Sequence, residues 1–248
     1  MGSIRRSLTV GVSLAALAAM IIPVGGALAA VTATLSKSTN LINGEQITVT
    51  LAGVPAGQGV YIQQCHQPKV GLRAATGLKC NGSLQQTDVM IWATMDGARG
   101  SQSAATPLTF TVRRSVTVGS ENLSCGVSDC ALFIFRDHRG PQDVSLDTIV
   151  PLTFLAEQTV KVRAIGFPKP GSAQEIGDRV VLRAANLATV QKTKLRVVSL
   201  TPRICAVTQG ATATSVSFDK RGECSLRLVA KATGKFARFE TTINYSVG

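Results

Sequence analysis

Gln46-Ile47-Thr48-Val49-Thr50-Leu51 alternates polar and apolar side chains, which is typical of a β-strand with one buried face. The turn signal Asn43-Gly44 stands just before it. Short runs of the same kind, rich in Val, Ile and Thr, recur along the chain, and no segment after residue 30 keeps a helical period. Many short strands separated by turns predict an all-β protein built from β-sandwiches. The further runs are Leu108–Val112, Leu132–Phe135, Arg179–Leu182, Ser225–Val229 and Thr242–Val247.

Residues 1–29 have the three parts of a secretory signal. Arg5 and Arg6 form a basic start, an uncharged apolar stretch runs from Leu8 to Val24, and Ala27-Leu28-Ala29 is a small-x-small cleavage site. The alternative is an uncleaved membrane anchor, but the apolar run is shorter than the roughly 20 residues that a spanning helix needs, and Pro23 interrupts it. We expect an exported protein, released or loosely wall-associated, with no transmembrane segment after cleavage.

Six cysteines fall into three close pairs along the chain. An even number behind an export signal is typical of disulfide bonds rather than free thiols. Six cysteines allow about 15 pairings, and nearest-neighbour pairing is favoured because each pair lies within one apparent hairpin or loop. In the chain-entropy model the two longer loops are each worth roughly 3 kcal/mol and the shortest roughly 2. The expected pairs are Cys65–Cys80, Cys125–Cys130 and Cys205–Cys224.

Positive charge is concentrated in the last third of the chain. Residues 30–154 have 9 Lys and Arg against 8 Asp and Glu, whereas residues 155–248 have 15 against 6, a net charge of +9. We place a domain boundary between residues 154 and 155, because the stretch around Thr153–Thr159 resembles a strand end followed by a connector. The asymmetry indicates a polyanionic partner for the second domain, such as anionic wall polymer, acidic lipid or nucleic acid. The alternative is a solvated basic surface that keeps the protein soluble. The candidate polyanion-binding residues alternate along their strands and are Arg179, Arg183, Lys192, Lys194 and Arg196.

Residues 30–154 resemble the neocarzinostatin family of small secreted proteins that carry enediyne antibiotics. The most specific motif is Phe110-Thr111-Val112-Arg113-Arg114-Ser115, which is similar to the family's Leu-Thr-Val-Arg-Arg-Ser. The pair Cys125 and Cys130, with four residues between, is next in specificity. The resemblance implies a seven-stranded immunoglobulin-like sandwich, disulfides 65–80 and 125–130, and a cleft that holds an apolar chromophore. In that family the ligand damages DNA, so antibiotic and DNA-binding roles would come through the ligand. Other matching stretches are Val31–Thr34, Ala52–Gly57, Gln64-Cys65, Gly77–Asn81, Asp96-Gly97, Asp137–Gly140 and Leu152–Phe154.

The implied cleft departs from the family's pattern. The resemblance places Cys65 and Cys80 at its floor. Antibiotic carriers have aromatic residues near both cysteines and in a loop after the Arg-Arg-Ser motif, whereas residues 116–123 here contain none. On the strand after the short disulfide, the carriers' Gln, Gly and Ser are replaced by Ala131, Phe133 and Phe135. The candidate ligand-binding residues are Gln63, Cys65, Gln67, Cys80, Leu84, Ala131, Phe133 and Phe135.

All these replacements make the cleft less suited to a large aromatic ligand. A Phe in place of Gly adds a large side chain that can fill the cavity, and loss of rim aromatics removes surfaces that stack on a polyene. Phe133 and Phe135 have two interpretations: core packing, which is ordinary for an alternating strand, or ligand lining. An open volume of several hundred cubic ångströms beside Gln63, Cys65, Cys80 and Phe133 would support a protein that carries a small molecule. A cleft filled by the Phe side chains would support a scaffold protein without a ligand.

Residues 158–247 resemble bacterial immunoglobulin-like repeats. Leu200–Val207 is similar to the Thr-Pro-x-Val-Cys-x-Val motif, and Arg221–Leu226 to the Gly-x-Cys-x-Ile strand. Lys231-Ala232-Thr233-Gly234 fits the turn that follows. The resemblance implies a small sandwich joined by Cys205–Cys224, of a kind that serves as a spacer or adhesion module. The predicted fold is therefore all-β, with two immunoglobulin-like β-sandwich domains at 30–154 and 155–248 after the signal.

Motifs for catalysis or metal binding are lacking. His66 and His138 are the two histidines of the chain, and two histidines alone do not complete a typical zinc site or triad. Asp137 and Asp143 lie near each other in a Gly- and Pro-containing stretch, where acidic residues usually form turns. We expect a non-enzymatic protein without a metal. Two hypotheses remain: a secreted carrier of an apolar small molecule, or an envelope-associated binding or scaffold protein with a filled cleft and a polyanion-binding domain.

Overall fold

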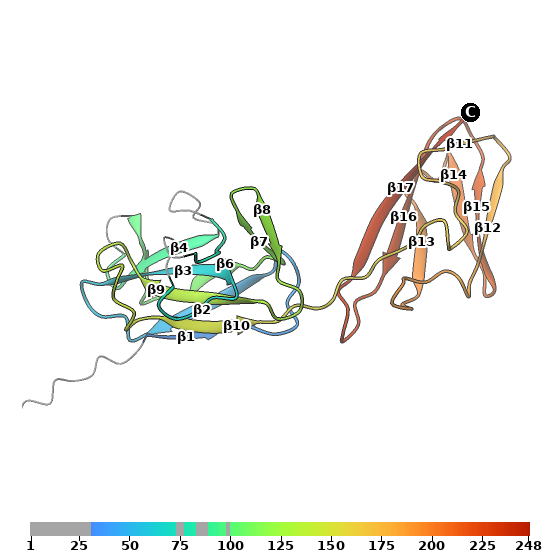
Figure 1. Ribbon diagram of the computed structural model, residues 1–248. Helices are drawn as coiled ribbons and strands as arrows, with labels where there is room; N and C mark the ends of the chain where they lie inside the picture. Colours follow the sequence, from blue (N-terminus) through green and yellow to red (C-terminus); the bar gives the residue numbers. More distant parts are fainter. Residues whose placement is uncertain (1–30, 73–76, 83–88, 98–99) are drawn as a thin grey trace, which may run out of the picture.

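The computed structural model describes residues 31–72, 77–82, 89–97 and 100–248. Throughout this part of the chain the regular secondary structure consists of β-strands, arranged in sheets in two regions (Figure 1). The all-β prediction is confirmed. The predicted signal peptide and Leu84 lie outside the described residues.

Two facing sheets make up the first region. A three-stranded sheet has the order β1-β2-β6, and a five-stranded sheet has the order β10-β9-β3-β4-β5. Seven longer strands thus form the layers, and the two-residue β5 pairs with the end of β4. The strands of the first sheet are β1 (Thr32–Leu35), β2 (Gln46–Ala52) and β6 (Leu108–Thr111). Those of the second are β3 (Gly59–His66), β4 (Met90–Thr94), β5 (Gln102–Ser103), β9 (Cys130–Arg136) and β10 (Thr148–Leu152).

The alternation that opens the sequence analysis sets the orientation of β2. Ile47, Val49 and Leu51 are buried, while the residues between them are exposed, so the strand turns one face to the core. Phe110 of β6 pairs with Ile47 across the sheet and is also buried. A hairpin of β7 (Ser115–Val118) and β8 (Glu121–Ser124) projects from this region (Figure 1).

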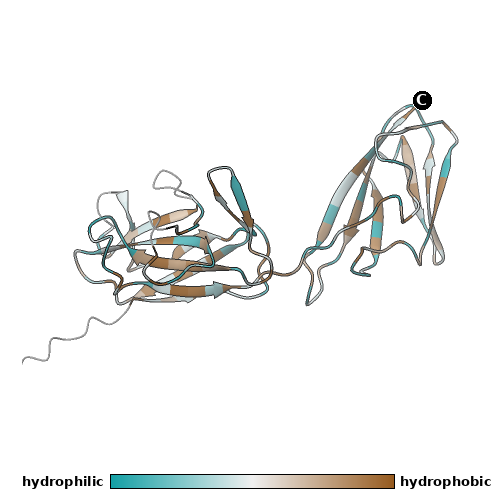
Figure 2. Cartoon of the chain, in the orientation of Figure 1, coloured by the Kyte–Doolittle hydropathy of each residue, from teal (hydrophilic) through white to brown (hydrophobic). Residues whose placement is uncertain are grey.

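The second region is a smaller sandwich with its own hydrophobic core. One sheet has the order β11-β17-β16-β13 and the other β12-β15-β14. Leu226, Leu228, Phe218 and Tyr245 are almost completely buried between them. Figure 2 shows the hydrophobic colour concentrated along the strands of both regions. The strands are β11 (Ala173–Gln174), β12 (Arg179–Arg183), β13 (Leu195–Ser199), β14 (Cys205–Gln209), β15 (Ala213–Phe218), β16 (Gly222–Ala230) and β17 (Phe239–Val247).

The segment between the two cores is hydrogen-bonded at both ends. The Leu155 N–H donates to the Leu41 carbonyl at 2.9 Å, and the Ala156 N–H donates to the Lys235 carbonyl at 3.1 Å. Arg114 from the Arg-Arg motif contacts this segment, donating to the Leu155 carbonyl and pairing with Glu157 at 3.3 Å. The predicted boundary between residues 154 and 155 falls in this segment and stays a prediction.

All three predicted disulfides are present. Cys65 is bonded to Cys80, Cys125 to Cys130, and Cys205 to Cys224. The first ties β3 to the loop that covers it, and the second closes the turn between β8 and β9. The third joins β14 in one sheet of the second sandwich to β16 in the other. Each bond stays within one region, as the nearest-neighbour argument predicts.

Replacing Cys205 and Cys224 together by Ala should destabilise the second sandwich alone. The bond closes a loop with a sequence separation of 19 residues, which the chain-entropy model values at about 3 kcal/mol. Amide hydrogen exchange on the full chain would measure this residue by residue. We expect faster exchange across β13–β17 and unchanged protection in β3 and β9. Equal loss of protection in both regions would contradict independent cores.

Candidate functional site

The five-stranded sheet is apolar on both faces. β3 and β9 are buried along nearly their whole length. On one face, Val60, Ile62, Leu132 and Ile134 belong to the sandwich core. The other face holds a separate cluster, which we call the aromatic face. It consists of Tyr61, Met90, Trp92, Phe133 and Phe135, together with Cys65 and Leu78.

Strand register arranges the aromatic face in rows. Trp92, Tyr61 and Phe135 pair in sequence across β4, β3 and β9. The next row runs through Met90, Gln63, Phe133 and Ile149, and the row after it pairs Cys65 with Ala131. Because alternate residues of neighbouring strands share a face, one continuous surface results.

The rings of this face contact one another. Phe133 and Phe135 are stacked with centroids 5.1 Å apart, and Tyr61 lies 5.7 Å from Phe135. His138 extends the series, 6.1 Å from Tyr61 and 5.2 Å from Trp92. Offset and tilted contacts of this kind add about 0.5–1.5 kcal/mol per pair beyond area burial.

Burial decreases along the face toward His138. Phe133 is 0% exposed, Tyr61 6% and Phe135 9%, whereas Trp92 is half-buried and His138 is exposed. Leu78 and the partly buried Leu72, both from the chain that follows β3, pack in the same cluster. Phe133 is therefore the floor of the face, and its Tyr61–Trp92 end lies nearest to solvent.

Five of the predicted ligand-binding residues gather on this face: Gln63, Cys65, Ala131, Phe133 and Phe135. Cys80 joins them through its disulfide and is partly buried. Gln67 does not, because it stands beyond the end of β3 with a φ of 43° and is exposed. The role of these residues in ligand binding stays a prediction.

The sequence analysis missed Tyr61, Met90 and Trp92. A signal for Tyr61 was present, because it precedes Gln63 by two residues on the same strand and so shares its face. Met90 and Trp92 could not be placed in this way, since their position depends on the pairing of β4 with β3.

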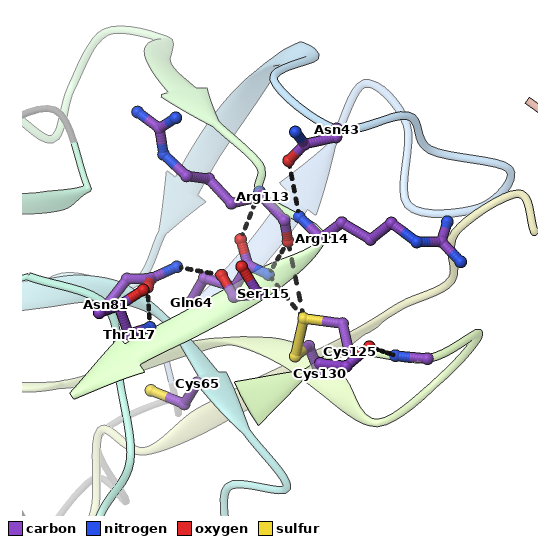
Figure 3. The surroundings of a disulfide bond; sticks show 12 residues. Asn43, Gln64, Cys65, Asn81, Arg113, Arg114, Ser115, Thr117, Cys125 and Cys130 are labelled. Carbon is purple, nitrogen blue, oxygen red and sulfur yellow. Dashed lines mark hydrogen bonds between the residues drawn. A yellow bond between two sulfur atoms is a disulfide. The ribbon is translucent and has the colours of Figure 1, made fainter. Parts of the chain in front are cut away.

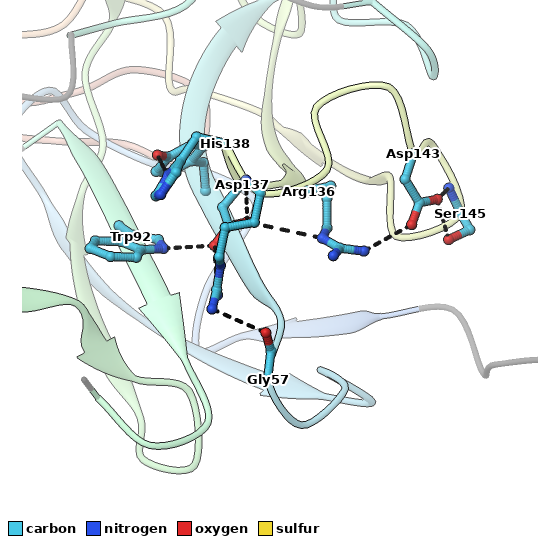
Figure 4. Close-up of polar contacts among 9 residues, drawn as sticks. Gly57, Trp92, Arg136, Asp137, His138, Asp143 and Ser145 are labelled. Atoms are coloured by element: carbon cyan, nitrogen blue, oxygen red, sulfur yellow. Dashed lines mark hydrogen bonds and ion pairs between the residues drawn. The ribbon is translucent and has the colours of Figure 1, made fainter. Parts of the chain in front are cut away.

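A charged network closes the His138 end of the face (Figure 4). The Tyr61 hydroxyl and His138 Nδ1 share a hydrogen bond of 2.6 Å. The Asp137 side chain is fully buried, and its Oδ2 accepts from Trp92 Nε1 at 3.0 Å and from Arg139 Nε at 2.8 Å. Figure 4 also shows Arg136 linked to Asp143, at 2.9 Å.

Burial and hydrogen bonding have opposite effects on the pKa of Asp137. Burial by itself raises the pKa of this carboxyl, but hydrogen bonds from Arg139 and Trp92 outweigh it, and the pKa is lowered overall. Asp137 is therefore ionised at neutral pH. At Tyr61 burial is the largest influence and the pKa is raised, so the phenol is neutral.

Two buried amides hold the opposite end of β3 (Figure 3). Gln64 is 0% exposed; its Oε1 accepts from the Arg113 N–H at 2.8 Å, and its Nε2 donates to the Arg113 carbonyl. Asn81 accepts from the Thr117 N–H at 2.7 Å and donates to the Ser115 carbonyl at 3.1 Å. The Arg-Arg-Ser motif thus has a structural role, because backbone groups of Arg113 and Ser115 form hydrogen bonds with these amides.

The predicted polyanion-binding residues occupy two different sheets. Arg179 and Arg183 are exposed on β12, whereas Arg196 is exposed on β13 of the other sheet. Lys194 forms a bridge with Ala188 just before β13, and Lys192 lies in a turn with a φ of 66°. They share no single face, and their role in binding stays a prediction.

Among the described residues, no group of three or more His, Cys, Asp or Glu side chains is placed to hold a metal ion. In the same part of the chain, no helix has the length and apolar character needed to cross a membrane.

Comparison with known proteins identifies the first region. A model of the neocarzinostatin family matches residues 33–154. Among solved structures the chain is similar to macromomycin, with 20% identity, coverage of 50% of this chain and 99% of that one, and a TM-score of 0.34. It is also similar to the C-terminal domain of the Streptococcus pyogenes antigen I/II-family protein AspA, with 9% identity, coverage of 88% and 99%, and a TM-score of 0.29. No curated protein matches the sequence.

The family match coincides with the first region of the fold. It begins in β1 and ends at Phe154, just after β10. Both disulfides that the resemblance implies, 65–80 and 125–130, lie within it. Residues 33–154 of this chain form a domain of the neocarzinostatin family.

Proposed function

We propose that this is an exported, non-enzymatic protein whose neocarzinostatin-family domain binds a planar apolar molecule on the aromatic face. The observation that supports it most is the second hydrophobic cluster, which lies on the side of the sheet away from the sandwich core. A sheet face turned away from the core is ordinarily polar. An apolar one covered by loops has the composition of a ligand site.

The gradient of burial suggests how the ligand would bind. The floor residue Phe133 would support the site from below, while the ligand stacks on Tyr61, Phe135 and Trp92. The Tyr61–His138 pair would face a polar substituent of the ligand. Any antibacterial activity or contact with DNA would then belong to the bound chromophore and not to the protein.

Trp92 provides a direct test, because it is the one Trp of the chain. N-phenyl-1-naphthylamine is a neutral aromatic probe with a flat naphthalene ring, and the basic second region should not attract it. We expect it to change Trp92 emission on binding. Phe135→Leu should weaken binding about two- to tenfold, the range given by 0.5–1.5 kcal/mol of ring stacking.

Phe110→Leu is the matched control, since Phe110 is also buried but belongs to the sandwich core. Its affinity for the probe should equal that of the wild type. Unchanged Trp92 emission at saturating probe, or the same loss of affinity in both variants, would contradict binding on the aromatic face.

A second candidate function is an envelope scaffold whose cleft is filled by its own side chains. Complete burial of Phe133 favours it, because this side chain already occupies space on the face where a ligand would lie. In that case the domain would serve as a rigid unit that presents the basic second region. The probe experiment separates the two candidates.

We also infer that the second region binds anionic polymers weakly and without sequence specificity. Residues 155–248 have a net charge of +9, and basic side chains are exposed on both of their sheets. Binding of this type is driven largely by counterion release. At physiological ionic strength exposed charges interact over only about 8 Å, so contact must be close.

Retention of the exported chain on immobilised poly(glycerol phosphate), anionic vesicles and DNA should fall steeply with salt, because released counterions supply most of the binding free energy. Wall polymer should retain it best. Retention that does not change between about 50 and 500 mM salt would leave the charge as a solubility feature.

A further inference from the structure

A cavity of about 340 Å³ opens on the surface of the second region. Its lining combines two segments. One is the turn that starts at Lys161, and the other is the loop between β12 and β13, which includes Asn186, Val190 and Lys192. In this turn the N–H groups of Ala164 and Ile165 both donate to the Lys161 carbonyl, so the backbone there is fixed.

All charged residues that line the cavity are positive. Lys161 and Lys192 line it, and no carboxylate does. Both lining segments belong to stretches of sequence, 158–174 and 179–218, that contain no Asp or Glu. Within the described chain neither lysine forms an ion pair. The charges are therefore available to an anion from outside.

Buried hydrogen bonds hold one lining residue of the cavity, Thr189, in place. Thr189 is 3% exposed and Gln158 5%. The Thr189 hydroxyl donates to Gln158 Oε1 at 3.2 Å and accepts from the Thr193 N–H at 3.0 Å. Gln158 Nε2 in turn donates to the carbonyls of Lys231 and Ala237, at 3.0 and 2.7 Å. The loop that ends in Lys192 is thus anchored to the sandwich.

We propose that this cavity binds the phosphodiester group of an anionic wall polymer. The proposal rests on the inferred polyanion binding of the second region and gives it a location. Two lysines in the lining of one open cavity suit a phosphate, because lysine binds phosphate as a point charge. The apolar side chains of Ile165 and Val190 offer a surface to the carbon atoms between phosphates.

The lining favours a phosphate-linked polyol over nucleic acid. Proteins that bind single-stranded nucleic acid without sequence preference stack its bases on aromatic side chains. The residues that line this cavity include none. Asn186 also lines the cavity, and an amide side chain can donate to and accept from the hydroxyl groups of a polyol.

The test compares two double variants of the full exported chain. Lys161→Gln with Lys192→Asn removes both cavity charges, and Asn tolerates the left-handed backbone conformation of residue 192. Lys169→Gln with Lys220→Gln removes the same charge from exposed positions outside the cavity. The probe is a poly(glycerol phosphate) oligomer of defined length, and its dissociation constant is measured by calorimetry at about 150 mM salt.

We expect the cavity variant to bind about tenfold more weakly than the wild type, which equals about 1.4 kcal/mol. The control variant should change affinity by less than about threefold. Both should unfold at the wild-type temperature, so that the difference reports binding.

Equal losses of affinity in the two variants would overturn the cavity as the binding site. Diffuse binding of polyanions by the second region would then remain. Failure of the wild type to bind the oligomer would overturn both proposals. Tighter binding of single-stranded DNA with the same number of phosphates, lost in the cavity variant, would overturn the choice of wall polymer.

Discussion

Asp137→Asn should lower the free energy of unfolding of the first domain by about 3 kcal/mol, the upper end of the range for hydrogen bonds to a charged group. The carboxylate is fully buried and accepts hydrogen bonds from Trp92 and Arg139. An amide nitrogen in its place would face other donors and leave the Arg139 guanidinium without its counter-charge. Urea unfolding followed by Trp92 emission measures the loss at the site itself.

The same carboxylate predicts how stability depends on pH. The pKa of Asp137 is lowered in the folded protein, so its stabilisation is complete above the unfolded value of about 4. That stabilisation is lost as pH falls through the folded pKa. Wild-type stability should therefore decline in acid more steeply than that of Asp137→Asn.

Asp143→Asn is the control, because Asp143 pairs with Arg136 near the surface, where such pairs are worth about 0–1 kcal/mol. Gly59→Ala should reproduce the Asp137 defect without changing a charge. A Cβ at Gly59 would lie 2.3 Å from Asp137 Oδ2 and 2.9 Å from Trp92 Nε1. If Asp143→Asn is as destabilising as Asp137→Asn, the buried network does not have this role.

Phe133→Ala should cost about 3–5 kcal/mol of unfolding free energy, the usual range for a fully buried Phe. Phe133 is 0% exposed, stacked on Phe135 and enclosed by the cluster that includes Leu78 and Met90. The shortened side chain would leave a cavity in the floor of the aromatic face. Chemical denaturation measures the change.

Phe133→Leu separates volume from ring stacking, since it fills most of the space and should cost far less. The cavity left by Phe133→Ala should also admit a small apolar guest that stabilises the variant. A loss below about 1 kcal/mol for Phe133→Ala would show that the floor is not packed as described.

The sequence predicted the strands and disulfides more completely than it predicted the residues of the aromatic face. Alternation in Gln46–Leu51 indicated β2, and close spacing indicated each disulfide. Both signals are local. The family resemblance placed Gln63, Phe133 and Phe135 on one cleft wall, and the register of β3 with β9 brings them together.

The parts that sequence reasoning missed depend on long-range pairing. Trp92 reaches the aromatic face because β4 pairs with β3, which no local pattern specifies. The interpretation of Asp137 as a turn former missed the buried role that Trp92 and Gly59 create around it. Likewise, Lys161 and Lys192 are 31 residues apart in the chain, and only the fold brings them into the lining of one cavity.

Native mass spectrometry of the protein purified from its natural host would show whether the first domain carries a ligand. We expect a noncovalent complex with one apolar molecule, released on denaturation and depleted in the Phe135→Leu variant. The measured protein should contain three disulfides and no covalent adduct. A single mass for the unliganded chain, under conditions that preserve the N-phenyl-1-naphthylamine complex, would contradict a ligand-carrying function.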